Sequence, residues 1–505
     1  MRNHSRAARN ASALHLRRLI ADHQLTPRTP GHVRQRGAIA ILFALTLIPI
    51  IGMCALALDM ALVYNRKVEM YNLAKAVALS AARGLNGTPA GINAAVANAA
   101  ITAGATKFKN YAETITWSDA ALMFSTTPGN NGPWMDSGAA SANAAQVFYV
   151  RVDTASLSSA GIVETMLARV LSAEFATLAI DSAAIAGRVD IAVAPLAICA
   201  MSNTPAAPRN NTGGYTELVE YGFRRGVSYD LMNLNPNGAS PVNFVINPLA
   251  MPDTGGAAAA LETSTLGPYV CAGMLGIPRV TGGKIAVARP FPLGSLYRQL
   301  NSRFDQYDGG VCTPNSAPPD VNIKPYDYTA MVTPLAWMMT APEGQTATTS
   351  ASATRLETIA DLPPPGGGAA KYGPLWAYAK AVAYSTYAAN PIEPVNGYAT
   401  MSTTSWPSLY GNQTAKSSYP ASTPYKAGSG TNALKPSTAH APGLKNRRVL
   451  NVALLNCSSP PVNAASVLAV GKFFMTVPAT PTVLAAEFAG VMPMERITGN
   501  TEIFE

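Results

Sequence analysis

The chain of 505 residues is long enough for about two to four ordinary domains. Its residues are 48% hydrophobic and only 13% charged, which one membrane segment and several Ala-rich stretches would explain. The net charge is +9, but residues 1–36 hold eight arginines and one acid, whereas the rest of the chain has 29 basic and 27 acidic side chains. A nearly neutral main part excludes an extended phosphate-binding surface, so we expect no nucleic-acid partner.

An uncharged run, Gly37–Leu58, follows the basic tail 1–36. As a helix it would span about 33 Å, close to the roughly 30 Å of a bilayer's hydrocarbon core. Pro49 and Gly52 lie inside it, and membrane helices tolerate both residue types. We therefore predict a membrane anchor over 37–58 in contact with the lipid bilayer, marked by Gly37, Pro49, Gly52 and the following Asp59.

Two other interpretations of this run are open. It could be a cleaved signal peptide, because Ala55-Leu56-Ala57 resembles a cleavage site. However, the run is longer than the roughly 7–15 residues of a signal-peptide core and follows a long basic segment, which favours an uncleaved anchor. It could also be a buried helix of a soluble protein, but it lacks a polar face. The positive-inside rule places residues 1–36 in the cytoplasm and the chain after Asp59 across the membrane.

The helical pattern continues over residues 59–84. Small residues crowd its second half, where Ala74, Ala78 and Ala82 form a candidate helix-packing face. Gly84 and the Asn86-Gly87 pair then stop the pattern. We predict a stalk helix that leaves the membrane.

The N-terminal features occur in a recognisable order: Arg36-Gly37-Ala38, an apolar run with Pro49 and Gly52, Asp59, Tyr64, and the Ala-rich stretch 72–82. This order resembles the Tad-type N-terminal domain of TadG-like proteins, which are encoded with Flp (tight-adherence) pilus machinery. The resemblance covers about 36–84. Many relatives have an Asp in the Ala-rich stretch where this chain has Lys75.

The resemblance implies a location and partners. It implies a single-pass protein of the bacterial inner membrane, with a cytoplasmic N-terminus and a periplasmic C-terminal region. The implied partners are Tad/Flp pilus-assembly proteins or minor pilins, in a system for cell adhesion. A pilin would carry Glu at the fifth position after its leader, whereas the fifth residue after Gly37 is Leu42. We therefore expect neither prepilin-peptidase cleavage nor a major-pilin role.

The rest of the chain predicts an α+β fold with a mixed α/β, strand-rich periplasmic region and long Pro/Gly/Ser/Tyr-rich loops. Residues 85–190 are predicted as a small α/β region. Within it the patterns indicate a strand over 146–153, a short amphipathic helix over 162–171 and an extended segment over 176–188.

Two apolar runs of similar form, 190–199 and 449–457, each end in Cys. They predict two strands of related placement in one sheet. The first opens a strand-rich region, 191–339, which includes a short strand over 241–248. The second opens the closing strands, 446–505.

Residues 340–445 have a different composition, rich in Ala, Ser, Thr, Pro, Gly and Tyr, and include Pro363–Gly368. Such composition is typical of long loops or partial disorder. The tyrosines here either pin these loops onto the domain, which we favour, or form a sticky surface for a partner or a glycan. They are Tyr372, Tyr378, Tyr384, Tyr387, Tyr398, Tyr410, Tyr419 and Tyr425.

Cys54 lies in the apolar run, and four cysteines lie beyond it. An even number in an oxidising compartment favours disulfides, and four cysteines allow three pairings. We prefer Cys199–Cys457 with Cys271–Cys312, because the first two end similar strands. A metal site is disfavoured, since no pair has C-x-x-C spacing and histidine ligands are missing.

The histidines limit the chemistry that is available outside the membrane. His4, His15, His23 and His32 lie in the tail, so a Ser-His-Asp triad would have to use His440. The chain contains no G-x-S-x-G, H-E-x-x-H or P-loop pattern. The nearest match to a D-x-S-x-S adhesion motif starts at Asp153 and has Ala155 in place of the first Ser. We expect no catalytic residue, no metal site and no cofactor.

The most notable group of acids outside the membrane comprises Asp305, Asp308, Asp320 and Asp327. The preferred interpretation is a structural turn in which Arg303 pairs with an acid, and 301–305 resembles a segment of related pilus-assembly proteins. Calcium binding is the alternative, but the Asp-x-Asp-x-Asp-Gly spacing of a loop site is absent. The sequence thus predicts a non-enzymatic accessory protein of Flp pilus assembly, and the alternative is an anchored hydrolase or surface-binding adhesion protein.

Overall fold

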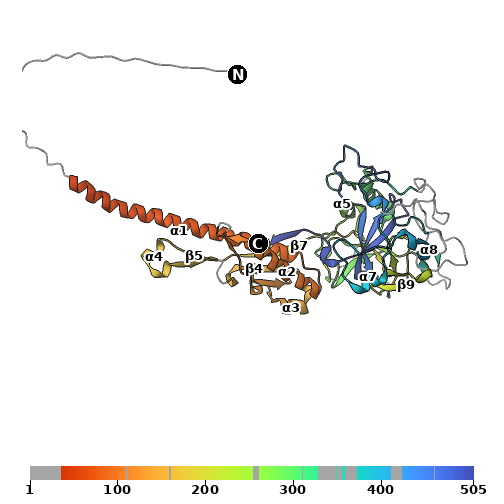
Figure 1. The fold of residues 1–505 in the computed structure, drawn as a ribbon, viewed down its shortest axis with the longest axis horizontal. Coiled ribbons are helices and arrows are strands. Elements are labelled where there is room, and N and C mark those ends of the chain that lie inside the picture. Colours follow the sequence, from red (N-terminus) through yellow and green to blue (C-terminus); the bar gives the residue numbers. More distant parts are fainter. Residues whose placement is uncertain are drawn as a thin grey trace, which may run out of the picture.

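The computed structural model describes residues 36–109, 112–157, 161–253, 261–309, 311–327, 348–349, 355–358, 372–410, 423–459 and 461–504. The tail before Arg36, the run Pro363–Gly368 and Tyr419 lie outside these residues. The described chain forms a long helix, a small body (residues 66–188 and 501–504) on its second half, and a head (residues 191–497) beyond the body (Figure 1). The predicted α+β, strand-rich fold class is confirmed.

Helix α1 (Arg36–Ala82) is continuous over 47 residues, about 70 Å at 1.5 Å per residue. Pro49 and Gly52 are its only helix-breaking residues after Gly37, and the following stretch to Ala82 has none. Every residue from Ala40 to Cys54 is exposed, whereas Met70, Leu73 and Ala74 are almost completely buried. The first half of α1 is therefore bare and the second half belongs to the body.

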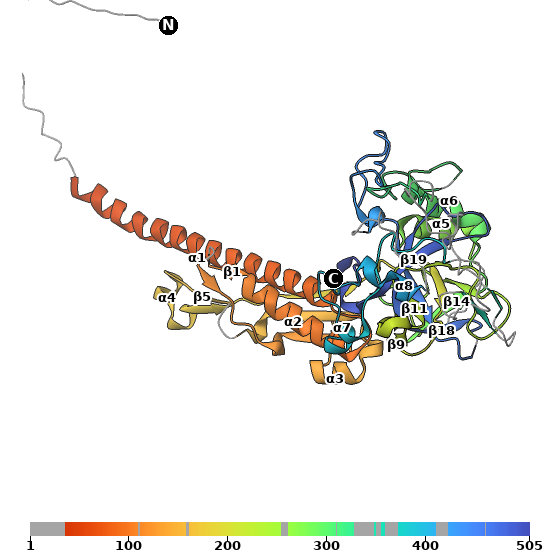
Figure 2. The ribbon, with the colours of Figure 1, turned by 45° about the vertical axis from the view of Figure 1, so that its right-hand side comes forward.

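The body packs α1 against a four-stranded antiparallel sheet of order β20-β7-β4-β3, and a second helix packs on α1. Helix α2 (Pro89–Ala105) lies beside α1 (Figure 2). It starts with Pro at its first position and with Thr88 as N-cap, whose Oγ1 accepts a hydrogen bond from Gly91 N at 3.2 Å. The other elements are β1 (Lys107–Phe108), β2 (Glu113–Thr114), β3 (Leu122–Ser125), α3 (Ser137–Ala142), β4 (Tyr149–Asp153), β7 (Ala183–Arg188) and β20 (Thr501–Phe504).

A hairpin extends from the body along α1 toward the N-terminal end of that helix (Figure 1). Strand β5 (Ile162–Glu164) pairs antiparallel with β6 (Thr177–Ala179), and α4 (Ala168–Leu171) lies in the connecting tip. The predicted helix over 162–171 is therefore wrong for its first half. Ile162 and Glu164 are exposed while Val163 is buried, which is the two-residue period of a strand.

The head is built around a seven-stranded sheet of order β12-β19-β18-β14-β13-β8-β17, in which β17 also pairs with β18. The pairings β8–β13, β13–β14, β14–β18, β18–β17 and β17–β8 thus form a closed ring of five strands. The bounds are β8 (Leu196–Cys199), β12 (Ser228–Asp230), β13 (Asn243–Ile246), β14 (Lys284–Ala288), β17 (Val449–Leu455), β18 (Ala464–Met475) and β19 (Ala485–Met492).

The two Cys-terminated runs form neighbouring strands of this ring. Strands β8 and β17 are parallel, and Leu455 lies opposite Cys199. Their placement in one sheet confirms the prediction from their similar sequences. Apolar residues of both strands fill two cores, one on each side of the sheet.

Smaller elements cover the ring. A three-stranded sheet of order β11-β10-β9 and four short helices surround it. They are β9 (Ala207–Asn210), β10 (Thr216–Glu220), β11 (Phe223–Arg224), α5 (Thr263–Ala272), α6 (Leu293–Asn301), α7 (Tyr384–Ala389) and α8 (Trp406–Leu409). The strands β15 (Thr348–Thr349) and β16 (Leu356–Glu357), which pair with each other, lie within the Tyr-rich region, residues 340–445.

The described part of the Tyr-rich region is packed onto the head. Trp376 and Trp406 are completely buried, with ring centroids 4.7 Å apart, and Trp376 Nε1 donates to Tyr410 Oη at 2.7 Å. The described tyrosines are buried or half-buried, which supports the prediction that they pin loops onto the domain.

Strand β20 brings the end of the chain back from the head to the body, where it pairs with β7 (Figure 1). This pairing was not predicted from the sequence. A second contact joins the two parts, because Thr281 Oγ1 donates to the Asn86 carbonyl at 2.8 Å and Arg279 donates to the Ala145 carbonyl. Body and head are therefore connected at several points.

Candidate functional site

The four cysteines beyond the apolar run form two pairs. Cys199 is bonded to Cys457 at the ends of β8 and β17, and Cys271 at the end of α5 is bonded to Cys312. These are the pairs that the sequence analysis preferred. Cys54 is a free, exposed cysteine on the bare half of α1.

His440 meets one acid of the predicted group. Its Nδ1 lies 2.5 Å from Asp305 Oδ1, and its ring contacts Tyr307 with centroids 4.8 Å apart. Asp305 Oδ2 also accepts from Ser437 N at 2.8 Å. Partial burial raises the pKa of Asp305, but the hydrogen bonds from Ser437 and His440 outweigh this and lower it. The pair supplies two members of a triad, but among the described residues no serine hydroxyl is hydrogen-bonded to the ring.

The other acids of the predicted group each have different surroundings. Asp308 is exposed, whereas Asp320 is buried and accepts from Asn322 N and Arg448 N at 2.9 Å each. Asp327 lies 3.9 Å from Lys324 Nζ. Within the described ranges, no three His, Cys, Asp or Glu residues are grouped so that they could hold a metal ion.

Arg303 and Asp153 have structural partners. Among the described residues Arg303 pairs with no acid, contrary to the prediction; it is 1% exposed and donates to the carbonyls of Val270 and Leu300. Asp153 accepts from Ala155 N at 3.1 Å and lies 2.9 Å from Arg151 Nη2. Both side chains therefore hold turns in place.

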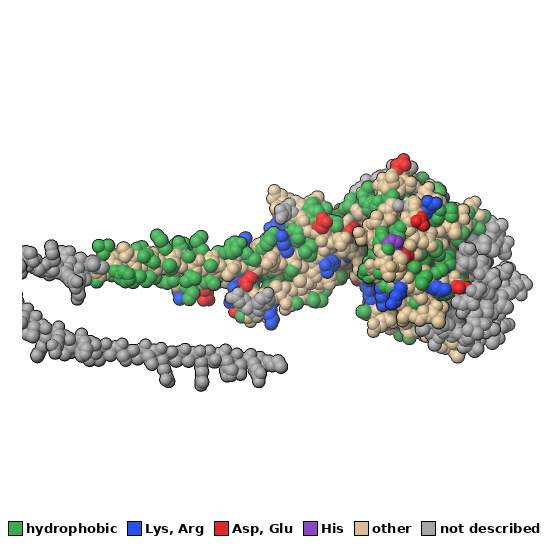
Figure 3. Space-filling model, turned by 90° about the horizontal axis from the view of Figure 1, so that it is seen from above, with side chains coloured by type: hydrophobic (Ala, Val, Ile, Leu, Met, Phe, Trp, Pro, Cys, Tyr) green, Lys and Arg blue, Asp and Glu red, His purple; other side chains and the backbone are tan. Residues whose placement is uncertain are grey.

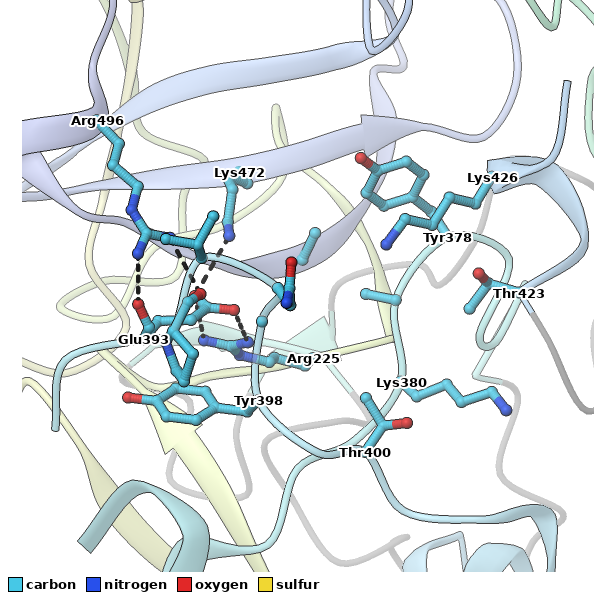
Figure 4. A pocket seen from close by; sticks show the side chains of 16 residues that line it. Arg225, Tyr378, Lys380, Glu393, Tyr398, Thr400, Thr423, Lys426, Lys472 and Arg496 are labelled. Atoms are coloured by element: carbon cyan, nitrogen blue, oxygen red, sulfur yellow. Dashed lines mark hydrogen bonds and ion pairs between the residues drawn. The ribbon is translucent and has the colours of Figure 1, made fainter. Parts of the chain in front are cut away.

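The head has a pocket of about 440 Å³ that is lined by five cationic side chains and one acid (Figure 4). Glu393 lies on one side, where Arg225 and Lys472 contact its carboxylate at 3.0 and 3.4 Å. Burial raises the pKa of Glu393, but these two cations outweigh it and lower the pKa. Arg496 donates to the Glu393 carbonyl at 2.8 Å, and Lys380 and Lys426 lie across the pocket. The pocket carries net positive charge, which fits an acidic group. Its residues come from distant segments, so no sequence pattern marks the pocket.

The bare half of α1 has the properties of a membrane span. Its surface is almost continuously hydrophobic (Figure 3), including Ile48, which is 71% exposed, and Met53, which is 74% exposed. Leaving this surface in water would cost roughly 25 cal/mol per Å². Among the described helices, α1 alone is long and apolar enough to cross a membrane. Because this half is exposed, the interpretation as a buried core helix of a soluble protein is wrong. The uncleaved anchor stays a prediction.

Asp59 ends this bare half and has a specific partner. Its carboxylate accepts hydrogen bonds from the backbone N–H groups of Met166, Leu167 and Ala168 at 2.7–3.0 Å, and its side chain is 3% exposed. From the sequence, Asp59 marks only the end of the predicted membrane span. The hairpin tip that it contacts lies more than one hundred residues further along the chain, so no local pattern indicates it.

The predicted helix-packing face is occupied within the chain. Ala74, Ala78 and Ala82 are completely buried in the core of the body, together with Ala95 and Ala99 of α2. Polar contacts flank this interface: Thr102 Oγ1 donates to Ser80 Oγ at 2.7 Å. At Gly84 an added Cβ would lie 2.5 Å from the backbone nitrogen of Ala95, so glycine is required for the close approach.

Asp59, the Ala face and Gly84 all lie in one recognisable segment. Residues 37–84 match the family model of the Tad domain, described as putative Flp pilus-assembly TadE/G-like. The resemblance to Tad-type proteins is thus confirmed over these residues, and the match supports involvement in Flp pilus assembly. No curated protein and no solved structure matches the chain significantly.

The Tad segment, residues 37–84, presents an exposed side on the part of α1 that follows its bare half. Tyr64 is 69% exposed, Val68 39% and Tyr71 38%, and Lys75 Nζ lies 4.0 Å from the Tyr71 ring centroid. At about 100° per residue, these side chains lie on the face of α1 opposite to Asp59 and Met70. We refer to these four residues as the outer face. Lys75 therefore points outward.

Proposed function

We propose that this protein is a membrane-anchored accessory protein of Flp pilus assembly that acts by protein–protein contacts in the periplasm and has no enzymatic activity. The observation that carries the proposal is the match of residues 37–84 to the Tad domain. The bare apolar half of α1 supports an anchor in the bacterial inner membrane. The arginines before it support a cytoplasmic N-terminus, with the body and head in the periplasm.

The outer face is an exposed part of the Tad segment that remains available to a partner. The Ala face is filled by α2, and Asp59 is held by the hairpin tip. Tyr64 and Tyr71 offer aromatic surface of the kind that dominates protein interfaces. A Tad/Flp assembly protein or a minor pilin would meet this face at the membrane surface.

Site-specific photo-cross-linking in cells that make the pilus tests the proposal. A photoreactive phenylalanine analogue at Tyr64 should cross-link a pilus-assembly protein or a minor pilin. The matched control is the same analogue at Tyr215, an exposed tyrosine of the head. A clean deletion of the gene should impair pilus display. Normal piliation in the deletion strain, together with no pilus protein at Tyr64, would refute the assembly role.

A hydrolase built on His440 makes the opposite prediction for that residue. His440→Ala removes the ring that contacts Asp305 and Tyr307. Under the assembly proposal this variant displays normal pili. Loss of pili with a normally folded His440→Ala protein would favour a catalytic or positioning role for this residue.

A second candidate function, binding of an acidic ligand by the head, is favoured by the cationic pocket. The test uses alginate, an acidic polysaccharide, as the probe for the full-length detergent-solubilised protein. Replacing Lys380 and Lys426 by Gln should weaken retention on an alginate matrix, whereas Lys284→Gln, at an exposed lysine elsewhere on the head, should not. Equal retention of both variants would rule out this pocket.

A further inference from the structure

The hairpin formed by residues 161–180 exposes apolar side chains that the proposed pilus contacts do not use. Val170 is 76% exposed, Met166 61%, Phe175 49%, Ile162 42% and Leu167 39%. All but Ile162 lie in the short tip between β5 and β6. A solvent-exposed tip would not ordinarily concentrate large apolar residues, so these side chains indicate a contact.

The position of the tip along α1 is fixed by two attachments. At the tip, the Asp59 carboxylate accepts the three backbone hydrogen bonds from residues 166–168. At the base, Lys67 Nζ donates to the Asp181 carbonyl at 2.5 Å. Between them a groove lined by Leu62, Arg66 and Val163 separates the hairpin from the helix. The hairpin is thus an arch with its tip held at the end of the apolar run.

The tip also reaches past Asp59 toward the N-terminus of α1. Ala55, one helical turn before Asp59 on the same side, is only 6% exposed, whereas Met53 and Leu56 beside it are 74% and 51% exposed. Helix α4 contacts α1, and Figure 1 shows it closer to the start of α1 than β5 is. Ala55 belongs to the apolar run Gly37–Leu58, so the tip overlaps the segment that spans the membrane.

We propose that the tip of this hairpin, residues 166–175, inserts into the outer interfacial layer of the lipid bilayer as a second membrane contact beside α1. This inference rests on the proposed anchoring of α1. The bilayer is the favoured occupant because the tip is continuous with the membrane-spanning surface and held at its end. Apolar segments of this kind bury about 5–10 Å into the boundary between headgroups and acyl chains.

The charged residues of the tip are compatible with this depth. Arg169 and Glu174 are both exposed, and Arg169 Nε donates to the Met166 carbonyl at 3.2 Å. Long basic side chains at a membrane boundary extend toward the headgroups. Asp59 itself is shielded by its three N–H donors. The polar groups at this level therefore have partners either in the chain or among the headgroups.

Spin-label accessibility of the full-length protein in phospholipid nanodiscs tests the proposal. Single cysteines replace Val170, Val462 or Ile48 in a Cys54→Ala background with both disulfides intact, and each carries a nitroxide. Val462 is the matched control, an exposed valine of the head. We expect the Val170 label to be accessible to lipid-dissolved oxygen and protected from a water-soluble nickel complex, with the reverse at Val462.

The label at Ile48 distinguishes a failure of the hairpin proposal from a failure of the proposed α1 anchor. If Ile48 reports lipid and Val170 reports water, the hairpin proposal is overturned while the anchor stands. If Ile48 also reports water, the anchor itself fails. Protection of Val170 from both reagents would mean that a second copy of the chain covers the tip, and it would likewise overturn the bilayer contact.

A charge variant provides an independent test of the tip. Val170→Glu places a carboxylate where the proposal has lipid, and it removes no buried side chain of the folded chain. The variant should shift a label at Phe175 from oxygen-accessible to nickel-accessible. Unchanged oxygen accessibility at Phe175 would show that the tip is not held by the bilayer.

Discussion

The body and the head fill their cores with different kinds of residues. The body joins α1 to α2 through small side chains, with Ala74, Ala78 and Ala99 completely buried. The head has cores of large aromatic residues such as Trp376 and Trp406, buried arginines and two disulfides. Small residues stabilise by close backbone approach, so the body should be sensitive to enlargement. The head should be sensitive to the loss of partners.

The largest effect is expected at the buried ion pair of the head. Arg224 Nη2 lies 2.8 Å from Glu217 Oε2, and both side chains are at most 1% exposed. Glu217→Gln leaves the buried guanidinium without its counter-charge and should lower the free energy of unfolding by about 3–5 kcal/mol. Urea denaturation of the full-length protein in detergent measures this loss.

A double variant provides the control for the ion pair. Glu217→Leu combined with Arg224→Met removes both charges and should recover much of the stability, because apolar side chains of similar size need no counter-charge. If Glu217→Gln costs less than about 1 kcal/mol, buried charge is not what stabilises this part of the head.

The next effect concerns the two disulfides. Replacing Cys199 and Cys457 by Ser opens a loop of 258 residues, whereas replacing Cys271 and Cys312 opens one of 41. Each loss should cost about 2–5 kcal/mol, and the long-loop pair should cost about 1–2 kcal/mol more. Denaturation midpoints of the two double variants compare them. A larger loss for the short loop would contradict the chain-entropy explanation.

In the body, enlargement should be the damaging change. Ala78→Leu inserts three carbon atoms into the completely buried interface with α2 and should cost up to about 3 kcal/mol. Ala76→Leu, at an exposed position two residues earlier on the same helix, should stay within about 0.5 kcal/mol of the unmodified protein. Thermal unfolding measures both. Equal stability of the two variants would mean that the helices separate easily.

The head should also be the pH-sensitive part. Burial raises the pKa of Glu487 to about 7 from its ordinary value of 4.5, although the carboxylate accepts hydrogen bonds from Ala377, Tyr378 and Ala379. Between these values the folded state keeps a proton that the unfolded state releases. This group's contribution therefore falls as pH rises, by about 2 kcal/mol between about pH 5 and pH 7.

Glu487→Gln removes the titrating group and should flatten this part of the stability profile. Urea titrations of both proteins across this pH range give the difference. An unchanged slope would mean that Glu487 stays ionised, with the three N–H donors outweighing its burial.

The features that could be predicted from the sequence depend on local signals. The continuous α1 follows from an uncharged run and a stretch without Gly or Pro, and the neighbouring placement of β8 and β17 follows from two similar apolar runs that end in Cys. The burial of Trp376 and Trp406 was harder to predict, because their surroundings have the composition of loops and only tertiary packing buries them.

The features that could not be predicted are contacts between distant segments. Asp59 meets backbone groups of residues 166–168 rather than a side chain of recognisable type, so no motif marks the contact. The helix predicted over 162–171 is wrong for its first half because residues 162–164 pair with β6 as a strand of alternating burial. Their helical sequence pattern is weak. The cationic pocket gathers Arg225, Glu393 and Lys472 from three separate segments, which composition alone does not reveal.

The return of strand β20 has a mechanical consequence. The chain leaves the body after Arg188 of β7 and comes back at Thr501 of β20, and these two residues lie opposite each other. A pulling force on the head would load both strands in the same direction, so their mutual hydrogen bonds would carry little of it. The load would pass from β7 to β4 in shear, and from there to α1. Under the proposed pilus role, tension on the head would thus act on α1 through a sheet rather than through a single peptide tether.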